Sequence, residues 1–364
     1  MSVVRYSAAI IDWTVEEIEK LDRDTRQLLF EHRFLHPRAN VTRLYMKRKE
    51  GGRGLISIED CVASERRTLD LYIASSEEVL LQHVARVNQL EKENIENKKV
   101  YLERIAKEKK EKVKSMPLHG QFERQTEKKK TSESWTWLAR GDLKRETESL
   151  IIAAQDQALA TNSIKKSIHK TTENDMCRLC GKKVESVTHI VSACQMLAQC
   201  EYKRWHDKVC THVHWHLCRI KGFDTNEKWY LHQPEKVLEN EHTKILWDFN
   251  VQTDRYIEHR RPDIILIDKE SRECSVIDVA IPGDHNIDNK EVEKITKYSD
   301  IIIEIQKMWN VKATCIPIVV GALGSVPKKL TYFLDQLKIK YDIGTIQKTA
   351  ILGSAHILRK VLSI

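Results

Sequence analysis

The stretch RRPDIILIDKESRECSVIDVAIP, residues 260–282, predicts two short, largely buried strands joined by a polar hairpin loop. Asp263 opens the first apolar run, and Asp278 lies inside the second, on the same strand face as Val276 and Ala280. A carboxylate in a sheet interior is costly unless something binds it. Adjacent antiparallel strands would bring the two aspartates together at one end, where their charges repel unless a divalent cation lies between them. Because oxygen-only ligands favour magnesium or manganese, we expect Asp263 and Asp278 to hold Mg²⁺ or Mn²⁺.

A helix is predicted directly after these strands, over residues 289–309. Lys290, Lys294 and Lys297 fall at i, i+4 and i+7, so they share one face of this helix. Tyr298 lies one turn from Lys294. The opposite face is predicted to be a core-facing apolar stripe of Val292, Ile295 and Ile302.

A further apolar strand, 314–324, completes an order of strand, strand, helix, strand that resembles the core of the PD-(D/E)XK nucleases. In that chemistry the acids hold the metal ion, and a lysine positions or activates the attacking water. The family's usual lysine position, two residues after the second acid, is Ala280 here. We therefore expect the lysine to come from the helix, as Lys294 or Lys297, with Tyr298 supporting it. A simpler interpretation stays open, because Pro-Asp is common as a turn or cap and helical lysines commonly face solvent.

A second motif, MCRLCGKKVESVTHIVSAC, places Cys177, Cys180, His189 and Cys194 in the spacing C-x2-C-x8-H-x4-C. Two thiols on a tight loop and two ligands returning from a short helix complete a tetrahedron, and this ligand set selects zinc. With all four positions filled by protein, the zinc is expected to be structural. Cys200 is the one serious rival to Cys194.

His212, His214 and His216 alternate with Val213 and Trp215 a little further along the chain. This row could indicate a second metal site. Because no complementary cysteine pair is at hand, we favour the edge of an amphipathic helix.

Bulk composition limits the class of protein. The chain has 364 residues, enough for two or three domains, and a net charge of +8, which permits nucleic-acid binding. Nine cysteines, an odd number, fit reduced thiols and a metal site better than a disulfide framework. No membrane span and no signal peptide are recognisable, so we expect a nuclear or cytoplasmic protein that is not secreted and has no membrane partner.

The segment 95–131 holds twelve Lys/Arg against six Glu, a surplus of 12 − 6 = 6 positive charges. It fits a solvated helix and linker, or a basic arm lying along phosphates. Further upstream, KRKEGGRG at 47–54 fits a solvated loop or a phosphate contact.

The expected fold is α+β, and its segments are a helical segment 1–90, a basic helical linker 91–134, a helical segment 135–172, a zinc knuckle with a basic helix 173–222, an α/β nuclease-like domain 223–345 and a C-terminal helix 346–364.

In combined order, these motifs resemble the C-terminal part of non-LTR retrotransposon polyproteins that carry a restriction-like endonuclease. In that family a Cys-Cys-His-Cys knuckle precedes a short Arg/His/Asp stretch, then Pro-Asp, a strand aspartate and a Lys/Tyr helix. The stretch here is EYKRWHDKV, which departs from the family's consecutive Arg-His by the inserted Trp205. The helical segments upstream look like the region that follows the reverse transcriptase palm, but no polymerase aspartate pair is present.

The resemblance implies an endonuclease that nicks target DNA and leaves a 3′-hydroxyl that primes reverse transcription. It implies target DNA, element RNA and a separate reverse transcriptase chain as partners. The expected nucleic-acid contacts are Arg204, His206, Lys208, Arg260 and Arg261. Two alternatives stay open: a catalytically inactive remnant that binds DNA or RNA, and an interaction protein built on the helices of 15–110.

Overall fold

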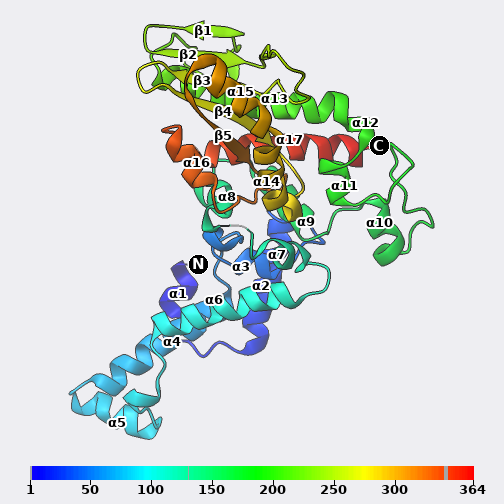
Figure 1. Ribbon diagram of the computed structural model, residues 1–364. Coiled ribbons are helices and arrows are strands. Elements are labelled where there is room, and N and C mark those ends of the chain that lie inside the picture. Colours follow the sequence, from blue (N-terminus) through cyan, green and yellow to red (C-terminus); the bar gives the residue numbers. More distant parts are fainter. Residues whose placement is uncertain (1, 130, 340–342) are drawn as a thin grey trace.

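The computed structural model describes residues 2–129, 131–339 and 343–364, and it has a mixed α+β fold. The predicted class is therefore confirmed. Three parts of the predicted segments lie outside the described residues: Met1, Lys130 of the basic linker, and 340–342 at the end of the nuclease-like domain. In Figure 1 the N-terminal helices form one end of the molecule, and a small sheet with its covering helices forms the other. Within the described ranges, no helix combines the length and apolar composition that a membrane crossing needs.

The N-terminal end is assembled around one long helix, α4, which contacts α1, α2, α5 and α6. Its elements are α1 (Ser2–Ser7), α2 (Val15–Glu31), α3 (Thr42–Tyr45), α4 (Ile58–Ser75), α5 (Val79–Val87), α6 (Lys98–Ser115) and α7 (Gln121–Thr126). Helix α6 carries much of the predicted basic arm. Lys98 Nζ lies 2.8 Å from Glu65 Oε1, and Lys109 pairs with Asp60, so part of its charge is neutralised by α4.

The glycine-rich turn at 47–54 is buried at Gly51, Gly52 and Arg53 and exposed at Lys47, Lys49 and Gly54. Arg48 and Arg53 both pair with the carboxylate of Glu148, which lies on α9 (Arg145–Gln155). A Cβ added at Gly51, which has a φ of 92°, would come within 2.7 Å of the Trp135 ring. Lys47 and Lys49 are exposed, so a solvated loop and a phosphate contact both stay predictions for this turn. The two guanidinium groups are held by a buried carboxylate that needs cations beside it.

A five-stranded sheet in the order β1-β2-β3-β4-β5 forms the C-terminal end. The first four strands pair antiparallel, and β4 pairs parallel with β5. The strands are β1 (Val237–Glu239), β2 (Thr243–Trp247), β3 (Ile264–Asp268), β4 (Glu273–Ala280) and β5 (Lys312–Val319). The predicted strand pair is present as the β3–β4 hairpin, and β5 is the predicted third strand. Alternation puts Ile265 and Val276 in one apolar cluster and Ile264 and Ile277 in another, so each sheet face has its own core.

The connection from β4 to β5 consists of two helices, α14 (Ile287–Lys297) and α15 (Ser299–Trp309), where one was predicted. The break lies at Tyr298, whose φ of −99° and ψ of 7° interrupt the helix. The predicted orientation of α14 is also wrong, because Val292 is 60% exposed and Ile295 38% exposed. The lysine face of α14 turns toward the sheet instead, and the next subsection gives the physical reason.

The opposite face of the sheet is covered by α13 (Lys203–Ile220) and α17 (Ile343–Leu362). The short helices of this half are α8 (Thr136–Arg140), α10 (Asn162–Ile164), α11 (Val187–Ser192), α12 (Gln195–Leu197) and α16 (Leu330–Gln336). Figure 1 shows α17 running through the middle of this half, with α8, α13 and α14 around it. Contacts of α17 with α8, α9, α11 and α13 make the predicted C-terminal helix a central element of the core.

Candidate metal centre and acidic site

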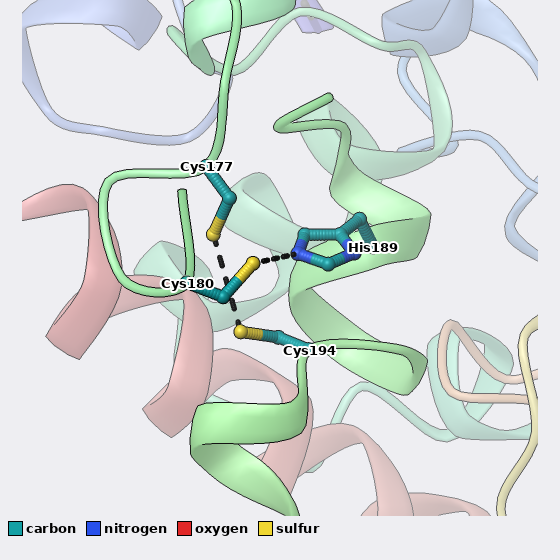
Figure 2. Close-up of side chains that lie close together, drawn as sticks. All are labelled: Cys177, Cys180, His189 and Cys194. Carbon is teal, nitrogen blue, oxygen red and sulfur yellow. Dashed lines mark hydrogen bonds between the residues drawn. The ribbon is translucent and has the colours of Figure 1, made fainter. Parts of the chain in front are cut away.

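Four cysteine and histidine side chains meet between a tight loop and α11. Figure 2 shows Cys177 and Cys180 on the loop, His189 on the helix and Cys194 just beyond it. Cys177 Sγ lies 3.9 Å from Cys194 Sγ, and Cys180 Sγ lies 3.4 Å from His189 Nε2. Zn–S bonds of about 2.3 Å put two thiolates of a tetrahedral site about 3.8 Å apart, so this spacing suits a zinc-sized ion. The predicted ligand set forms a cluster that could bind a metal such as zinc.

Local structure fixes the four ligands. Gly181 adopts a φ of 61° directly after the second cysteine, which lets the loop turn back sharply. The Tyr202 hydroxyl donates to Ile190 O at 2.6 Å and accepts the Cys194 N–H at 3.1 Å, so it joins α11 to the last ligand. Cys200 is exposed and lies outside the cluster, which decides between the two rival cysteines in favour of Cys194.

Asp263 and Asp278 lie at the same end of the β3–β4 hairpin and on the same sheet face. Ile264 pairs with Ile277, so Asp263, one residue before β3, comes opposite Asp278 on β4. The carboxylate Oδ2 of Asp263 accepts the Val279 N–H at 2.7 Å. Burial and, next, the charge of Asp263 raise the pKa of Asp278. The two aspartates thus share one end and one face of the hairpin, as the sequence predicts.

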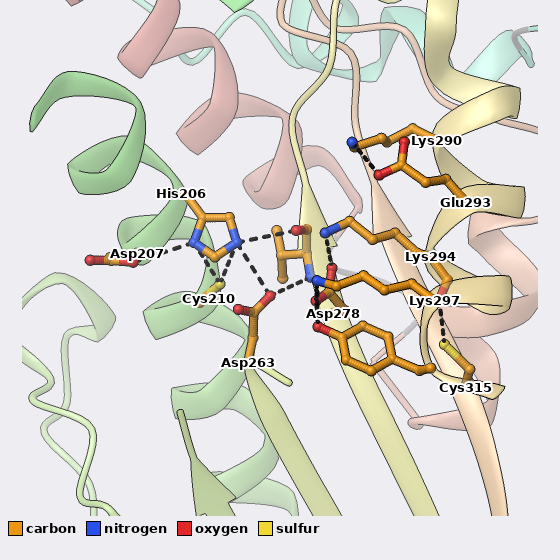
Figure 3. Close-up of polar contacts among 12 residues, drawn as sticks. His206, Asp207, Cys210, Asp263, Asp278, Lys290, Glu293, Lys294, Lys297 and Cys315 are labelled. Atoms are coloured by element: carbon orange, nitrogen blue, oxygen red, sulfur yellow. Dashed lines mark hydrogen bonds and ion pairs between the residues drawn. The ribbon is translucent and has the colours of Figure 1, made fainter. Parts of the chain in front are cut away.

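The Asp278 carboxylate is held by the lysine face of α14, as Figure 3 shows for Lys294 and Lys297. Tyr298 also binds it. Lys294 Nζ lies 2.5 Å from Asp278 Oδ2, and the Tyr298 hydroxyl donates to Oδ1. Lys297 Nζ lies 3.9 Å from Oδ1 and donates to the Tyr298 hydroxyl at 3.0 Å. Burial disfavours the Lys294 ammonium, but the charge of Asp278 outweighs it and raises the pKa of Lys294. The lysines thus face inward because a buried carboxylate needs a cation, which overrides the apolar pattern of α14.

His206 of α13 reaches the same site from the other side and contacts Asp263. Its Nε2 lies 3.2 Å from Asp263 Oδ2 and 3.1 Å from Val279 O, so Nε2 must carry a proton. Its Nδ1 lies 3.3 Å from Asp207 Oδ1. Burial works against the charge, but the hydrogen bond and the charge of Asp263 prevail and raise the pKa of His206 to about 9. Cys210, one turn along α13, places its Sγ 3.6 Å from both ring nitrogens.

His206 is also one of the predicted nucleic-acid contacts, and that role stays a prediction beside its observed contact with Asp263. The other predicted nucleic-acid contacts lie in different surroundings. Arg204 and Lys208 are exposed and line a separate groove along α13. Arg261 pairs with Asp248 at 2.5 Å, and Arg260 is half-buried. The signal that could have placed His206 is the helical spacing of His206 and Cys210, but their partner Asp263 is remote in the sequence.

Several oxygen acceptors lie around Asp263 and Asp278. Two carboxylates and the Val279 carbonyl supply oxygen ligands at one strand end. Asp278 Oδ2 has the Lys294 ammonium beside it at 2.5 Å, so a bound ion would share this oxygen with that ammonium. His206 and Lys294, both cationic, neutralise the acids in this structure.

A groove of about 950 Å³ extends from His189 of the cysteine cluster to residues that neighbour the two aspartates, although Asp263 and Asp278 themselves do not line it. His189 lines it at one end, and His206, Val279 and Lys294 line it at the other. Further basic side chains along it are Lys182, Lys183, His285 and Lys290. Among the described residues, no aspartate or glutamate lines this groove. Its surface is therefore suited to an anionic ligand.

Comparison of the chain with models of known protein families gave no match, and no curated protein sequence matched it. The chemistry available to the chain is thus given by its own residues. Two carboxylates, a lysine and a histidine lie at one strand end. The lysine and the histidine of this group also line a basic groove that reaches His189 of the Cys/His cluster.

Proposed function

We propose that this chain is a metal-dependent DNA endonuclease module derived from a non-LTR retrotransposon, which nicks target DNA and has no polymerase activity of its own. The observation that supports it most is the meeting of Asp263, Asp278 and Lys294 at the end of β3 and β4. Two carboxylates and an ammonium beside a basic groove are the groups that metal-assisted phosphodiester hydrolysis requires. The order of motifs along the chain gives independent support.

Two kinds of metal site are assigned in this proposal. The cluster of Cys177, Cys180, His189 and Cys194 holds zinc in a structural role, because four protein ligands leave no position for water. Asp263 and Asp278 hold Mg²⁺ or Mn²⁺, together with the Val279 carbonyl. When bound, that ion supplies Lewis-acid polarisation of the phosphate and lowers the pKa of a water.

The protein's own side chains then have distinct roles in nicking. Lys294, whose ammonium is held at 2.5 Å from Asp278, donates hydrogen bonds to the attacking water or to the phosphate and offsets charge that develops there. Lys297 and Tyr298 are positioning residues, because they fix Asp278 through Oδ1. His206 fixes Asp263 in the same way. In the PD-(D/E)XK nucleases the lysine lies two residues after the second acid. In this proposal a lysine from α14 takes that role.

The basic groove between the two centres is the proposed path of the target strand. Lys182 and Lys183 lie on the cysteine loop, and Lys290 lies on α14, the helix that carries Lys294. Phosphate contacts of this kind would make binding strongly salt-dependent and independent of sequence. Target DNA in the nucleus, element RNA and a reverse transcriptase on another chain are the partners that the proposal implies.

A remnant that binds nucleic acid without cutting it is the second candidate. It is favoured by His206 and Lys294, whose positive charges already neutralise the two acids and compete with a metal ion. Such a protein would keep its basic groove and lose its metal dependence.

The deciding experiment is nicking of supercoiled plasmid by the full chain, with and without Mg²⁺ or Mn²⁺. Wild type is expected to nick only with the metal, and Asp278→Asn to lose at least about 10²-fold of the rate. Asp268→Asn, at the far end of the same strand pair, is the matched control and should nick like wild type. Equal nicking by wild type and Asp278→Asn would overturn the proposal. Salt-sensitive binding without any metal-dependent product would establish the binding remnant instead.

A further inference from the structure

A third group of metal-binding side chains lies away from both centres described above. His214 and Cys218 are one turn apart on α13, and His232 follows a short turn at Trp229–Leu231. His214 Nδ1 lies 2.8 Å from His232 Nε2, and Cys218 Sγ lies 3.5 Å from the same His214 nitrogen. The three donor atoms all fall within 4.8 Å of one another. Two ligands spaced i, i+4 on a helix, with a third from a distant segment, is a recurrent arrangement of zinc sites.

The surroundings of these side chains leave one side open. His214 and Cys218 are completely buried, and the Trp247 ring of β2 stands edge-on to His214 at 5.3 Å. His232 is half-buried and lines a groove of about 570 Å³ together with Trp229. A bound ion would therefore have apolar walls behind it and access to solvent in front.

A plain hydrogen bond between two neutral imidazoles is the competing explanation. It accounts for His214 and His232, since one nitrogen can donate and the other accept. It gives no role to the Cys218 thiol, which points at the nitrogen that this bond already uses. Two imidazoles on one zinc ion are expected about 3.3 Å apart, from Zn–N bonds of about 2.0–2.1 Å, which needs only a small movement of the His232 loop.

We propose that His214, Cys218 and His232 bind a second zinc ion, with water or a ligand from the groove in the fourth position. One thiolate and two imidazoles select zinc over magnesium or calcium. Such an ion would tie α13 to the chain that enters β1, and so join the helix behind the cysteine cluster to the sheet. Of the alternating histidines His212, His214 and His216, only His214 takes part, and the remaining ligands come from outside that row. The site is independent of the proposed nuclease activity.

The first test is the metal content of the purified full chain by inductively coupled plasma mass spectrometry. Wild type should hold about two zinc ions per chain, and Cys218→Ser and His232→Gln about one each. The matched controls should hold about two: Cys274→Ser removes a buried thiol on β4, and His242→Gln an exposed histidine. One zinc per wild-type chain, unchanged in both ligand variants, would overturn the proposal.

A conservative variant separates a ligand role from a structural hydrogen bond. His232→Cys supplies a metal-binding thiolate but no imidazole, so it should keep the second ion while His232→Gln loses it. Cobalt substitution gives a second readout, because Cys218→Ser should remove one thiolate-to-cobalt charge-transfer contribution and leave those of the cysteine cluster. If His232→Cys and His232→Gln bind the same amount of metal, His232 is not a ligand and the site is ruled out.

Discussion

The ammonium of Lys294 lies 2.5 Å from the carboxylate of Asp278, and both groups are shielded from solvent. The pair joins helix α14 to strand β4, and the chain that connects these two elements separates Lys294 from Asp278 in the sequence. We expect Lys294→Met to lower the rate of metal-dependent nicking by about 10²–10³-fold, because a positive charge is lost where negative charge develops. At saturating DNA, Lys290→Met should lower the rate much less, since that ammonium pairs with Glu293 at 2.6 Å and is assigned to DNA binding along the groove. Equal losses in the two variants would show that the effect is general charge in the groove.

Asp278 should reduce the stability of the metal-free protein. Burial, and then the charge of Asp263, raise its pKa above the unfolded value, so the charged form is less favourable in the fold than in the unfolded chain. Because Asp278→Asn alone would leave the shielded Lys294 ammonium unpaired, the comparison is made between Lys294→Met and Lys294→Met/Asp278→Asn, where the second change should raise the free energy of unfolding by at least about 1 kcal/mol near neutral pH. The gain should disappear below about pH 4, where the carboxyl is protonated in both states. Denaturant unfolding of both proteins at the two pH values, without added magnesium, measures it, and a loss of stability near neutral pH would contradict the expectation.

Asp268, in the same hairpin, should instead stabilise the fold near neutral pH. A hydrogen bond from Lys221 at 2.9 Å lowers its pKa to about 2. Its ionised form therefore stabilises the fold above the unfolded pKa, and this contribution is lost as the pH falls through about 2. Asp268→Asn should cost about 1 kcal/mol near neutral pH after allowance for its partial exposure to solvent. The same unfolding series tests it, and a cost that persists at the lowest pH would point to lost packing.

Cys177→Ser should remove the zinc ion from the cysteine cluster and destabilise the structure around it. Ligand binding supplies folding energy in such small sites, and α11 packs through buried Ile190 against the central helix α17. We expect a loss of about 3 kcal/mol or more, with fast amide hydrogen exchange over 177–202. Cys200→Ser, at an exposed cysteine, should change the free energy of unfolding by no more than about 0.5 kcal/mol. A retained zinc ion in Cys177→Ser would exclude that thiol as a ligand.

The parts of the fold that could be predicted are those encoded over short distances. The C-x2-C-x8-H-x4-C spacing carries its own geometry, because a tight loop and one helical turn bring its four residues together. The β3–β4 hairpin is equally local, since alternation and a polar turn determine its register and therefore the meeting of Asp263 and Asp278.

The orientation of α14 could not be predicted from its own pattern. Val292 and Ile295 indicate a buried stripe, yet they face solvent, because the buried charge of Asp278 draws Lys294 inward. The positions of His206 and His232 depend on how α13 packs against the sheet. Local spacing carries no information about contacts between segments so distant in the sequence, and only the tertiary structure brings these histidines to Asp263 and His214.

The magnesium requirement should depend on pH through His206. Burial disfavours its charge, but the hydrogen bond and charge of Asp263 raise its pKa to about 9, so near neutral pH it is an imidazolium beside a proposed metal ligand. Magnesium that competes with this cation should bind more tightly as the pH rises toward about 9, by up to about tenfold per unit. In His206→Gln, which cannot be charged, the half-saturating magnesium concentration for nicking should be lower near neutral pH and nearly independent of pH. Magnesium titrations of both proteins at several pH values measure the two slopes. Equal slopes would show that His206 does not compete with the metal, and a nicking rate abolished in His206→Gln at saturating magnesium would show that it acts in the reaction itself.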